Sequence, residues 1–550
     1  MATRNFAMWF ALSITLAFAF SANADEPGLK EFDQAIATKI TAESLDELTE
    51  VVELVQSALD KGLDKDNTAF AKRLLAATLV QRAELVTGAM MQTLGGDPQG
   101  LQRFARLRQV AIADLERAVR HEPKLAEAHF QLGRLHTLPG GDRQRAVKEL
   151  DEAIKESGDD DDALKSKALV LRGSLHQDPQ RRLSDFTAAL KVDRNCVEAL
   201  RARGTHYLEQ GKANEALADL QSAVKQDPKH AGTHEVLGVA QASLEKFDEA
   251  VASLSKAIEL QENAPFAYVH RARIHLIRNN AQEALKDLDQ ALELSAPTPP
   301  VLLLRASAHQ QLKNKEKALA DVEQALKLRP GHVPALRARA MLAAGDGKFD
   351  VAITDLQEVK KANPQDASVL VQLGMLYSAS KHLNEAVEAF SKALEVDPKN
   401  VLAFQGRADT LIRMGKHVEA IKDYEAVLKQ DPKNSHVLNN LAWLLATSTE
   451  DKLRDGKRAI DLATQGCKVT DYKQAHIVST LAAGYAEVGD FKTAIEWSQK
   501  AVDLGDDELK ENLKKELESY QAGKPWREKQ EELSADKPAA ETATKPGERK

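Results

Sequence analysis

Short amphipathic helices recur along most of this chain of 550 residues. In residues 198–210 and again in 214–226, aliphatic side chains return at three- and four-residue steps, with polar residues between them. This spacing places the apolar side chains on one face of a helix. A polar turn with Gly211 separates the two helices, and Asp227-Pro228 ends the second, because proline cannot continue a helix. The pattern predicts a helix-turn-helix hairpin.

The hairpin repeats with a fixed period. Alanine stands at intervals of 34 residues at Ala216, Ala250, Ala284, Ala318, Ala352, Ala386 and Ala420. Proline follows at multiples of the same interval, at Pro228, Pro330, Pro364, Pro398 and Pro432. One hairpin is too small to bury its own apolar face, so it must pack on its neighbours. The period therefore predicts an all-α solenoid of stacked hairpins.

Small and aromatic residues hold fixed places within each copy. In the clearest copy, residues 367–398, these are Gly374, Tyr377, Ala386, Phe390, Ala393 and Pro398. This arrangement resembles the tetratricopeptide repeat, over roughly residues 100–506. The resemblance implies an all-α solenoid of helix-turn-helix repeats that forms a right-handed superhelix. It also implies a concave face that binds peptides or proteins.

The pattern divides the chain into five regions. We expect a signal peptide at 1–24, an N-terminal helical cap with a degenerate first repeat at 25–123, about eleven repeats at 124–508, a capping helix at 509–522 and a disordered tail at 523–550. In the N-terminal cap the pattern predicts three longer helices, at about 41–62, 67–92 and 99–121. The tail has few apolar residues, so it cannot bury enough surface to offset its ordering entropy.

The N-terminus has the features of an export signal. An apolar run at residues 6–20 follows Arg4, and Ala22 and Ala24 form a cleavage site. The run is shorter than the ~20 residues of a membrane-spanning helix. We expect cleavage after Ala24, no stable membrane insertion afterwards, and export to the periplasm or an equivalent envelope space. An uncleaved N-terminal membrane anchor is the alternative. Motifs near the C-terminus, such as YQAGKPWRE, resemble the ends of exported bacterial repeat proteins.

The repeats allow an internal comparison at two positions. Arginine precedes the small residue of the first helix in six copies, and only those copies have aspartate before the large apolar residue of the second helix. The pairs are Arg172 and Asp185, Arg203 and Asp219, Arg271 and Asp287, Arg305 and Asp321, Arg339 and Asp355, and Arg407 and Asp423. A guanidinium and a carboxylate can form two parallel hydrogen bonds, so we expect each pair to bridge two helices. The alternative is a basic stripe that binds an acidic partner.

Other side chains of the first helices are candidates for partner binding. The resemblance places the following residues at helix offsets that face the concave surface: Arg201, His270, Arg273, Arg337, Gln372, Gln405, Asn439, Asn440 and Trp443. The alternative for each is an ordinary solvated side chain.

The charge and the absence of known motifs exclude several classes of function. The net charge is −8 with both signs mixed, whereas a nucleic-acid-binding domain would be basic. Cys196 and Cys467 lie in distant repeats, so we expect no disulfide between them. The chain has no phosphate-binding loop, nucleophile elbow or His-Glu-x-x-His motif. We therefore expect no catalysis, cofactor, metal or nucleic acid.

These observations predict a non-catalytic interaction scaffold of the cell envelope, with protein or peptide partners in its groove. An adaptor for secretion or polysaccharide-export machinery is a narrower alternative. An enzyme that docks its substrate on the repeats is another, and only residues 25–123 are long enough to contain a catalytic module.

Overall fold

The computed structural model describes residues 27–93, 98–158 and 161–528, and these residues form helices without any strand. The helices are α2 (Leu29–Thr41), α3 (Leu45–Lys61), α4 (Lys65–Met91), α5 (Pro98–His121), α6 (Ala126–Thr137), α7 (Arg143–Glu156), α8 (Asp162–Leu175), α9 (Pro179–Val192), α10 (Val197–Glu209), α11 (Ala213–Gln226), α12 (Ala231–Ser243), α13 (Phe247–Leu260), α14 (Pro265–Ile277), α15 (Ala281–Leu294), α16 (Pro299–Gln311), α17 (Lys315–Leu328), α18 (Val333–Gly345), α19 (Phe349–Ala362), α20 (Ala367–Ala379), α21 (Leu383–Val396), α22 (Val401–Arg413), α23 (His417–Gln430), α24 (Ser435–Thr447), α25 (Gly456–Val469), α26 (Ala475–Glu487), α27 (Phe491–Leu504) and α28 (Asp507–Gln521), with a 3-10 helix at Asp451–Leu453. The expected signal peptide and residues 529–550 of the expected tail lie outside the described residues.

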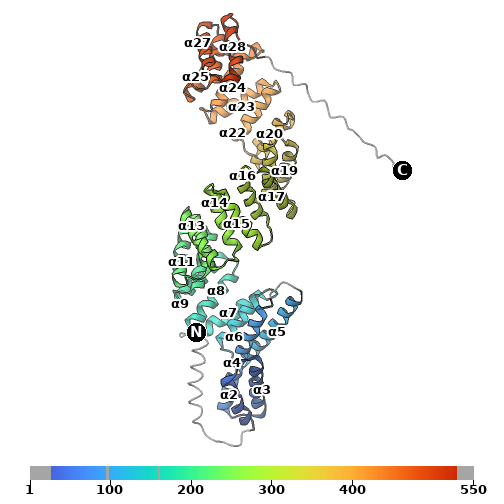
Figure 1. Cartoon of the computed structure of the whole chain (residues 1–550), viewed down its shortest axis with the longest axis vertical. Helices are drawn as coiled ribbons and strands as arrows, with labels where there is room; N and C mark the ends of the chain where they lie inside the picture. The colour runs from blue at the N-terminus through green and yellow to red at the C-terminus, as the bar shows by residue number, and fades with distance from the viewer. Residues whose placement is uncertain (1–26, 94–97, 159–160, 529–550) are drawn as a thin grey trace, which may run out of the picture. The chain divides into compact units, whose positions relative to one another are not determined.

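The helices follow one another as pairs, as Figure 1 shows within each of two compact units. The N-terminal unit ends at Arg278 and the C-terminal unit begins at Asn279, in the turn between α14 and α15. Within each unit, the first and second helices of a pair pack closely together, and each second helix packs on the next first helix. The all-α solenoid expected from the 34-residue period is therefore the observed architecture.

Small residues set the distance between the helices. All seven alanines of the 34-residue series are 0% exposed. At Gly374 on α20, an added Cβ would lie 2.7 Å from the ring of Phe390 on α21, which is closer than van der Waals contact allows. The glycine and alanine periodicity therefore reflects close helix packing.

Several first helices contact the next first helix along the solenoid in each unit. In the N-terminal unit α6, α8, α10, α12 and α14 contact one another in series, and α16 with α18, α20 with α22 and α24 with α26 do so in the C-terminal unit. Successive second helices approach one another less closely. We call the surface formed by the first helices the inner face, and it carries the candidate binding residues.

The N-terminal helices agree with the expected pattern except at the start. Helices α3, α4 and α5 lie within about four residues of the three expected helices. Helix α2 was not anticipated as a separate element. It is held by Phe32 and Ala35, which are buried in a cluster with residues such as Leu48 and Leu75. Burial against α3 and α4, rather than a strong pattern of its own, stabilises α2.

Part of the segment expected to be disordered, residues 523–528, makes defined contacts in the structure. Residues 523–528 follow α28 and pack against α24 and α26, with Trp526 on the apolar cluster of that region. Composition failed here because three consecutive side chains find partners distant in the sequence. The remaining residues of the expected tail are not described.

In many helix pairs, the turn between the two helices contains one residue with left-handed backbone. This position is glycine in several pairs, but it is Lys381 (φ 66°) between α20 and α21. Left-handed geometry costs a non-glycine residue roughly 1–2 kcal/mol, whereas glycine loses about 0.5–1 kcal/mol through extra backbone entropy. We therefore expect Lys381→Gly to raise the free energy of unfolding by roughly 0.5–1 kcal/mol, as measured by urea denaturation. Lys416→Gly, at an ordinary φ of −90°, should give no gain. An equal gain from both variants would contradict this explanation.

Candidate ligand-binding surfaces

Five of the six arginine–aspartate pairs come together within single helix pairs. Nε and Nη2 of Arg172, Arg203, Arg305, Arg339 and Arg407 donate to the two carboxylate oxygens over 2.6–2.9 Å. The aspartate side chains are 2–10% exposed and the arginine side chains 22–30%. Arg271 and Asp287 belong to different units, so this pair stays a prediction.

The remaining nitrogen of several of these arginines binds the preceding pair. Nη1 donates to Asp151 from Arg172 over 2.7 Å and to Asp289 from Arg305 over 2.8 Å. Nη1 of Arg407 reaches Ser391 over 2.9 Å in the same manner. Donors used in this way have little capacity left for an acidic partner, which favours a bracing role over a binding stripe.

The candidate residues of the N-terminal unit are spread over two helices. Arg201 on α10 lies with Nη1 3.1 Å from Nε2 of His230, the residue that caps α12. Arg273 on α14 is exposed, and His270 on the same helix is half-buried. Burial lowers the pKa of His270, and the charge of Arg273 adds to this effect, so the imidazole is held neutral. The structure does not bring these three side chains into one site.

Three candidates of the C-terminal unit lie on α18, α20 and α22. Arg337 donates to Asp366 over 2.7 Å, and Asp366 also caps α20 by accepting from the backbone of Ser368. Gln372 is exposed and Gln405 is half-buried. Arg337 therefore has a structural partner, whereas the two glutamines lie at the surface of the inner face.

The last three candidates belong to a polar network centred on α24. The amide nitrogen of Asn440 lies 3.0 Å from Nε2 of His436 and 3.4 Å from Oδ1 of Asp409. Asn439 accepts a hydrogen bond from the hydroxyl of Thr480 over 2.7 Å. Trp443 donates through Nε1 to the carboxylate of Glu528. Asn439, Asn440 and Trp443 thus form hydrogen bonds with side chains of α22, α24 and α26 and with Glu528.

Sequence reasoning missed three members of this network. Tyr424 donates to Oδ1 of Asp409 over 2.5 Å, and His436 lies 3.4 Å from the other carboxylate oxygen. Asp409 raises the pKa of His436, mainly by hydrogen bonding, while burial raises the pKa of the Tyr424 hydroxyl. Asp409 holds the same helix offset as Trp443, one period earlier, so the offset used to select Trp443 would also have found it.

Three exposed apolar side chains lie on the first helices that precede this network. Met341 on α18 is 60% exposed, Met375 on α20 is 45% exposed and Leu402 on α22 is 57% exposed. Met375 and Leu402 stand one period before Asp409 and His436, which contact each other. The repeat therefore places Met375 and Leu402 as neighbours. We call Met341, Met375 and Leu402 the apolar stripe.

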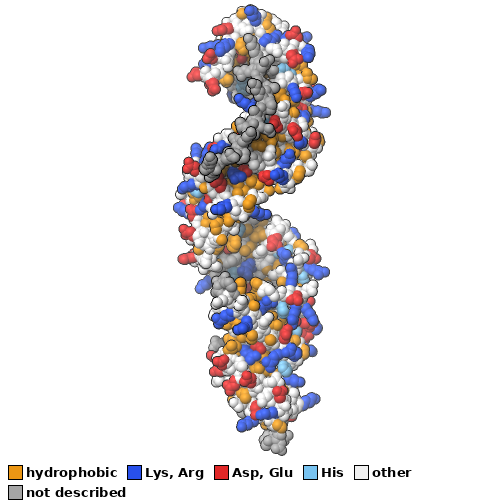
Figure 2. Space-filling view, turned by 90° about the vertical axis from the view of Figure 1, so that its right-hand side faces the viewer, with side chains coloured by type: hydrophobic (Ala, Val, Ile, Leu, Met, Phe, Trp, Pro, Cys, Tyr) orange, Lys and Arg blue, Asp and Glu red, His pale blue; other side chains and the backbone are white. Residues whose placement is uncertain are grey.

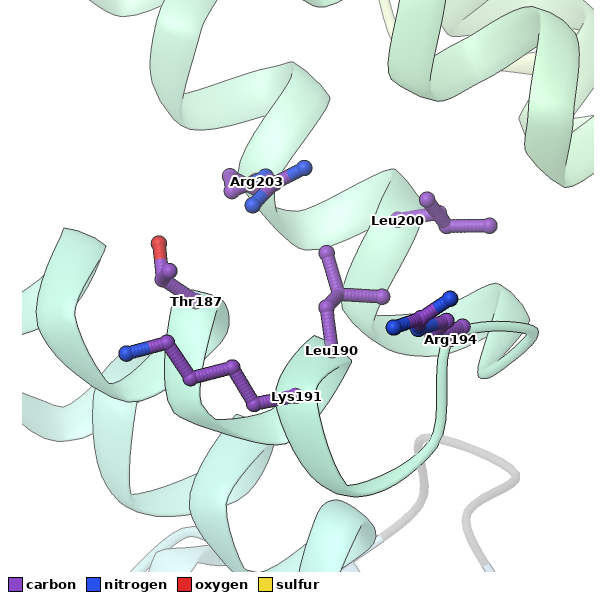
Figure 3. Close-up of a pocket in the computed structure, with 6 residues that line it drawn as sticks. All are labelled: Thr187, Leu190, Lys191, Arg194, Leu200 and Arg203. Carbon is purple, nitrogen blue, oxygen red and sulfur yellow. The ribbon is translucent and has the colours of Figure 1, made fainter.

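The described surfaces also have open recesses, and the larger of two, of about 600 Å³, is lined by Ala69, Lys72, Arg73, His121 and Glu122. Figure 2 shows charges of both signs interspersed on the face in view. Figure 3 shows a recess of about 240 Å³ between α9 and α10, lined by Thr187, Leu190, Lys191, Arg194, Leu200 and Arg203. Arg203 is already hydrogen-bonded to Asp219. In the described ranges no three His, Cys, Asp or Glu side chains are grouped to hold a metal ion. Both cysteines are buried free thiols, and burial raises the pKa of Cys467 to about 11.

No helix in the described part of the chain combines the length and the apolar character needed to cross a bilayer. The apolar run at residues 6–20 lies outside the described residues.

The fold and its surfaces define an α-solenoid of helix pairs that presents side chains on its first helices. Models of the tetratricopeptide repeat family match residues 176–231, 207–273, 303–367, 367–400 and 402–509. The chain is a tetratricopeptide repeat protein.

Known proteins resemble parts of the chain. Superkiller complex protein 3 of Mus musculus is 28% identical over 169 residues, which are 30% of this chain and 11% of that protein. The chain thus spans about a tenth of the length of this relative. The structure of yeast Tom70 is 16% identical, covers 73% of this chain and 96% of its own, with a TM-score of 0.33. YrrB, described as a TPR protein with an unusual peptide-binding site, is 21% identical and covers 34% and 95%, with a TM-score of 0.30.

Proposed function

We propose that this protein is a non-catalytic scaffold that binds extended peptides or protein segments on its inner face. The apolar stripe on α18, α20 and α22 supports this proposal most directly. Its three side chains are 45–60% exposed on consecutive first helices of a repeat protein, next to the polar network around Asp409. Methionine adapts to irregular surfaces, and flanking polar groups fix the register of a bound chain. The preferred partner is a segment with spaced apolar side chains.

The proposal is tested with peptides selected on the wild-type protein from a displayed random library. Met341→Glu combined with Met375→Glu should weaken the selected peptides at least about tenfold, because apolar side chains would meet two charges. Fluorescence anisotropy measures the dissociation constants. Val351→Glu with Val418→Glu is the matched control, since these valines are 42% and 51% exposed on the second helices α19 and α23. Equal losses in both double variants, or no loss in either, would count against the apolar stripe.

The cell compartment forms a second part of the proposal. The apolar run and the Ala22-Asn23-Ala24 site support a signal peptide that is cleaved after Ala24, with the mature protein in the periplasm or an equivalent envelope space. N-terminal sequencing of protein from fractionated cells should find Asp25 as the first residue. Recovery of the intact N-terminus in the membrane fraction would favour an anchor instead. An exported scaffold would suit an adaptor for secretion or polysaccharide export, which is the narrower form of the proposal.

A further inference from the structure

The segment after α28 turns back onto the inner face of the last helix pairs. Gly523, with φ of 66°, ends the helix: its N–H donates to the carbonyl of Tyr520 over 3.0 Å. The N–H of Lys524 donates to the carbonyl of Ser519 over 2.9 Å. This Schellman arrangement needs the left-handed glycine and reverses the chain direction. It delivers residues 525–528, which we call the return segment, to α24 and α26.

The return segment donates hydrogen bonds to backbone carbonyl groups at the C-terminal end of α24. Helix ends leave carbonyl groups without helical partners. The carbonyl of Ala446 accepts from Nη1 of Arg527 over 3.3 Å, and that of Thr447 accepts from the N–H of Glu528 over 3.2 Å. A guanidinium at this position is further favoured by the negative end of the helix dipole.

Three side chains of the return segment have separate partners. Trp526 packs on the apolar cluster that includes Leu445 and Tyr520. Nη2 of Arg527 lies 2.6 Å from Oε2 of Glu487, and the carboxylate of Glu528 accepts from Nε1 of Trp443. The return segment is therefore held as a bound peptide would be. Its aromatic ring lies on an apolar site, its guanidinium contacts a carboxylate, and its carboxylate accepts from an indole N–H.

The receiving surface is held by residues outside the return segment. Glu487 is 14% exposed and also accepts from Nε of Arg454 over 2.9 Å, which fixes its carboxylate on α26. Trp443 packs on the same apolar cluster from α24. The carbonyls, the carboxylate and the indole would therefore stay in place if the return segment left.

We propose that the return segment is an exchangeable internal ligand. The surface it covers is a binding site for partner segments in which an aromatic residue is followed by arginine and an acidic residue. The chain's own copy occupies the site at the high effective concentration of a tethered peptide, so a partner must displace it. This inference goes beyond the proposed function, because it concerns a different surface from the apolar stripe and its probe is the chain's own sequence.

The test uses a fluorescent peptide with the sequence of residues 522–528, AGKPWRE, and the full chain. Trp526→Ala with Arg527→Ala empties the site. Anisotropy should show that this variant binds the peptide at least about tenfold more tightly than the wild type, because an occupied site lowers apparent affinity. Adding Glu487→Gln should abolish the gain, and a peptide with glutamate in place of arginine should not bind.

A second variant distinguishes release of the return segment from unfolding of the last helices. Arg527→Glu keeps the Trp526 ring but removes the contacts of the guanidinium with Glu487 and with the carbonyl of Ala446, so it should produce the same direction of change. Hydrogen exchange of α26 and α28 amides checks that both variants stay folded. Equal binding to the wild type and to both emptied variants, or no binding to the emptied variants, would overturn the proposal.

Discussion

Replacing Arg339 by leucine is expected to lower the free energy of unfolding of the C-terminal unit by about 3 kcal/mol. The side chain of Asp355 is 2% exposed and receives hydrogen bonds from Arg339 over 2.7 and 2.6 Å. Leucine would leave this buried carboxylate without its main partner, which is far more costly than losing an exposed ion pair. Urea denaturation, with hydrogen exchange of α18 and α19 amides, measures the effect.

The chain supplies its own control for this prediction. The next copy carries Leu373 and Ala389 at the two corresponding positions. Arg339→Leu combined with Asp355→Ala copies that arrangement and removes the buried charge. We expect the double variant to recover most of the loss, because an apolar pair often replaces a buried ion pair without penalty. A single variant that costs under about 1 kcal/mol would show that the pair behaves as a surface bridge.

The second large effect is a dependence of stability on pH through Glu516. This residue on α28 is 7% exposed and accepts from the hydroxyl of Ser479. Burial raises its pKa from 4.5 to about 7. The folded state therefore holds the proton more tightly than the unfolded state. The resulting stabilisation is complete below pH 4.5 and is lost as the pH rises to about 7, and it amounts to about 3 kcal/mol.

Glu516→Gln should remove this pH dependence, because the amide keeps an acceptor for Ser479 and does not ionise. Thermal unfolding monitored from pH 4 to 8, with hydrogen exchange of α28, compares the variant with the wild type. Glu518→Gln is the control, since Glu518 is exposed on the same helix and the substitution changes the net charge equally. Parallel pH profiles of the wild type and Glu516→Gln would refute the role of this carboxyl group.

Repetition made the fold predictable from the sequence. The 34-residue alanines mark positions where helices touch, and every one of the seven is fully buried. A residue whose environment recurs many times in one chain can be interpreted by comparison, as the arginine and aspartate positions were. Arg172 and Asp185 are 13 residues apart, against 16 in the other pairs, yet they meet through the same atoms.

The candidate binding residues were less predictable, because their partners do not repeat. The helix offset placed Asn440 on a first helix, but its neighbours Asp409 and Tyr424 come from the preceding pair and occur together once. The composition of the return segment did not predict its contacts, for a similar reason. Its polar sequence is typical of disorder, whereas Arg527 and Trp526 are placed by α24 and α26. Local composition carries no information about such distant partners.

Five arginine–aspartate pairs, which we call braces, each lie inside one helix pair, and this affects how the chain can change its length. Both partners of a brace are gained or lost together when a whole 34-residue copy is duplicated or deleted. The new neighbour only has to offer a polar side chain to Nη1, and Asp151, Asp289 and Ser391 all do so. A deletion of one first helix alone would instead leave the carboxylate of its partner helix unpaired and place two second helices in sequence. Recombination in whole copies is therefore the route by which descendants of this chain could vary the extent of their binding face while remaining folded.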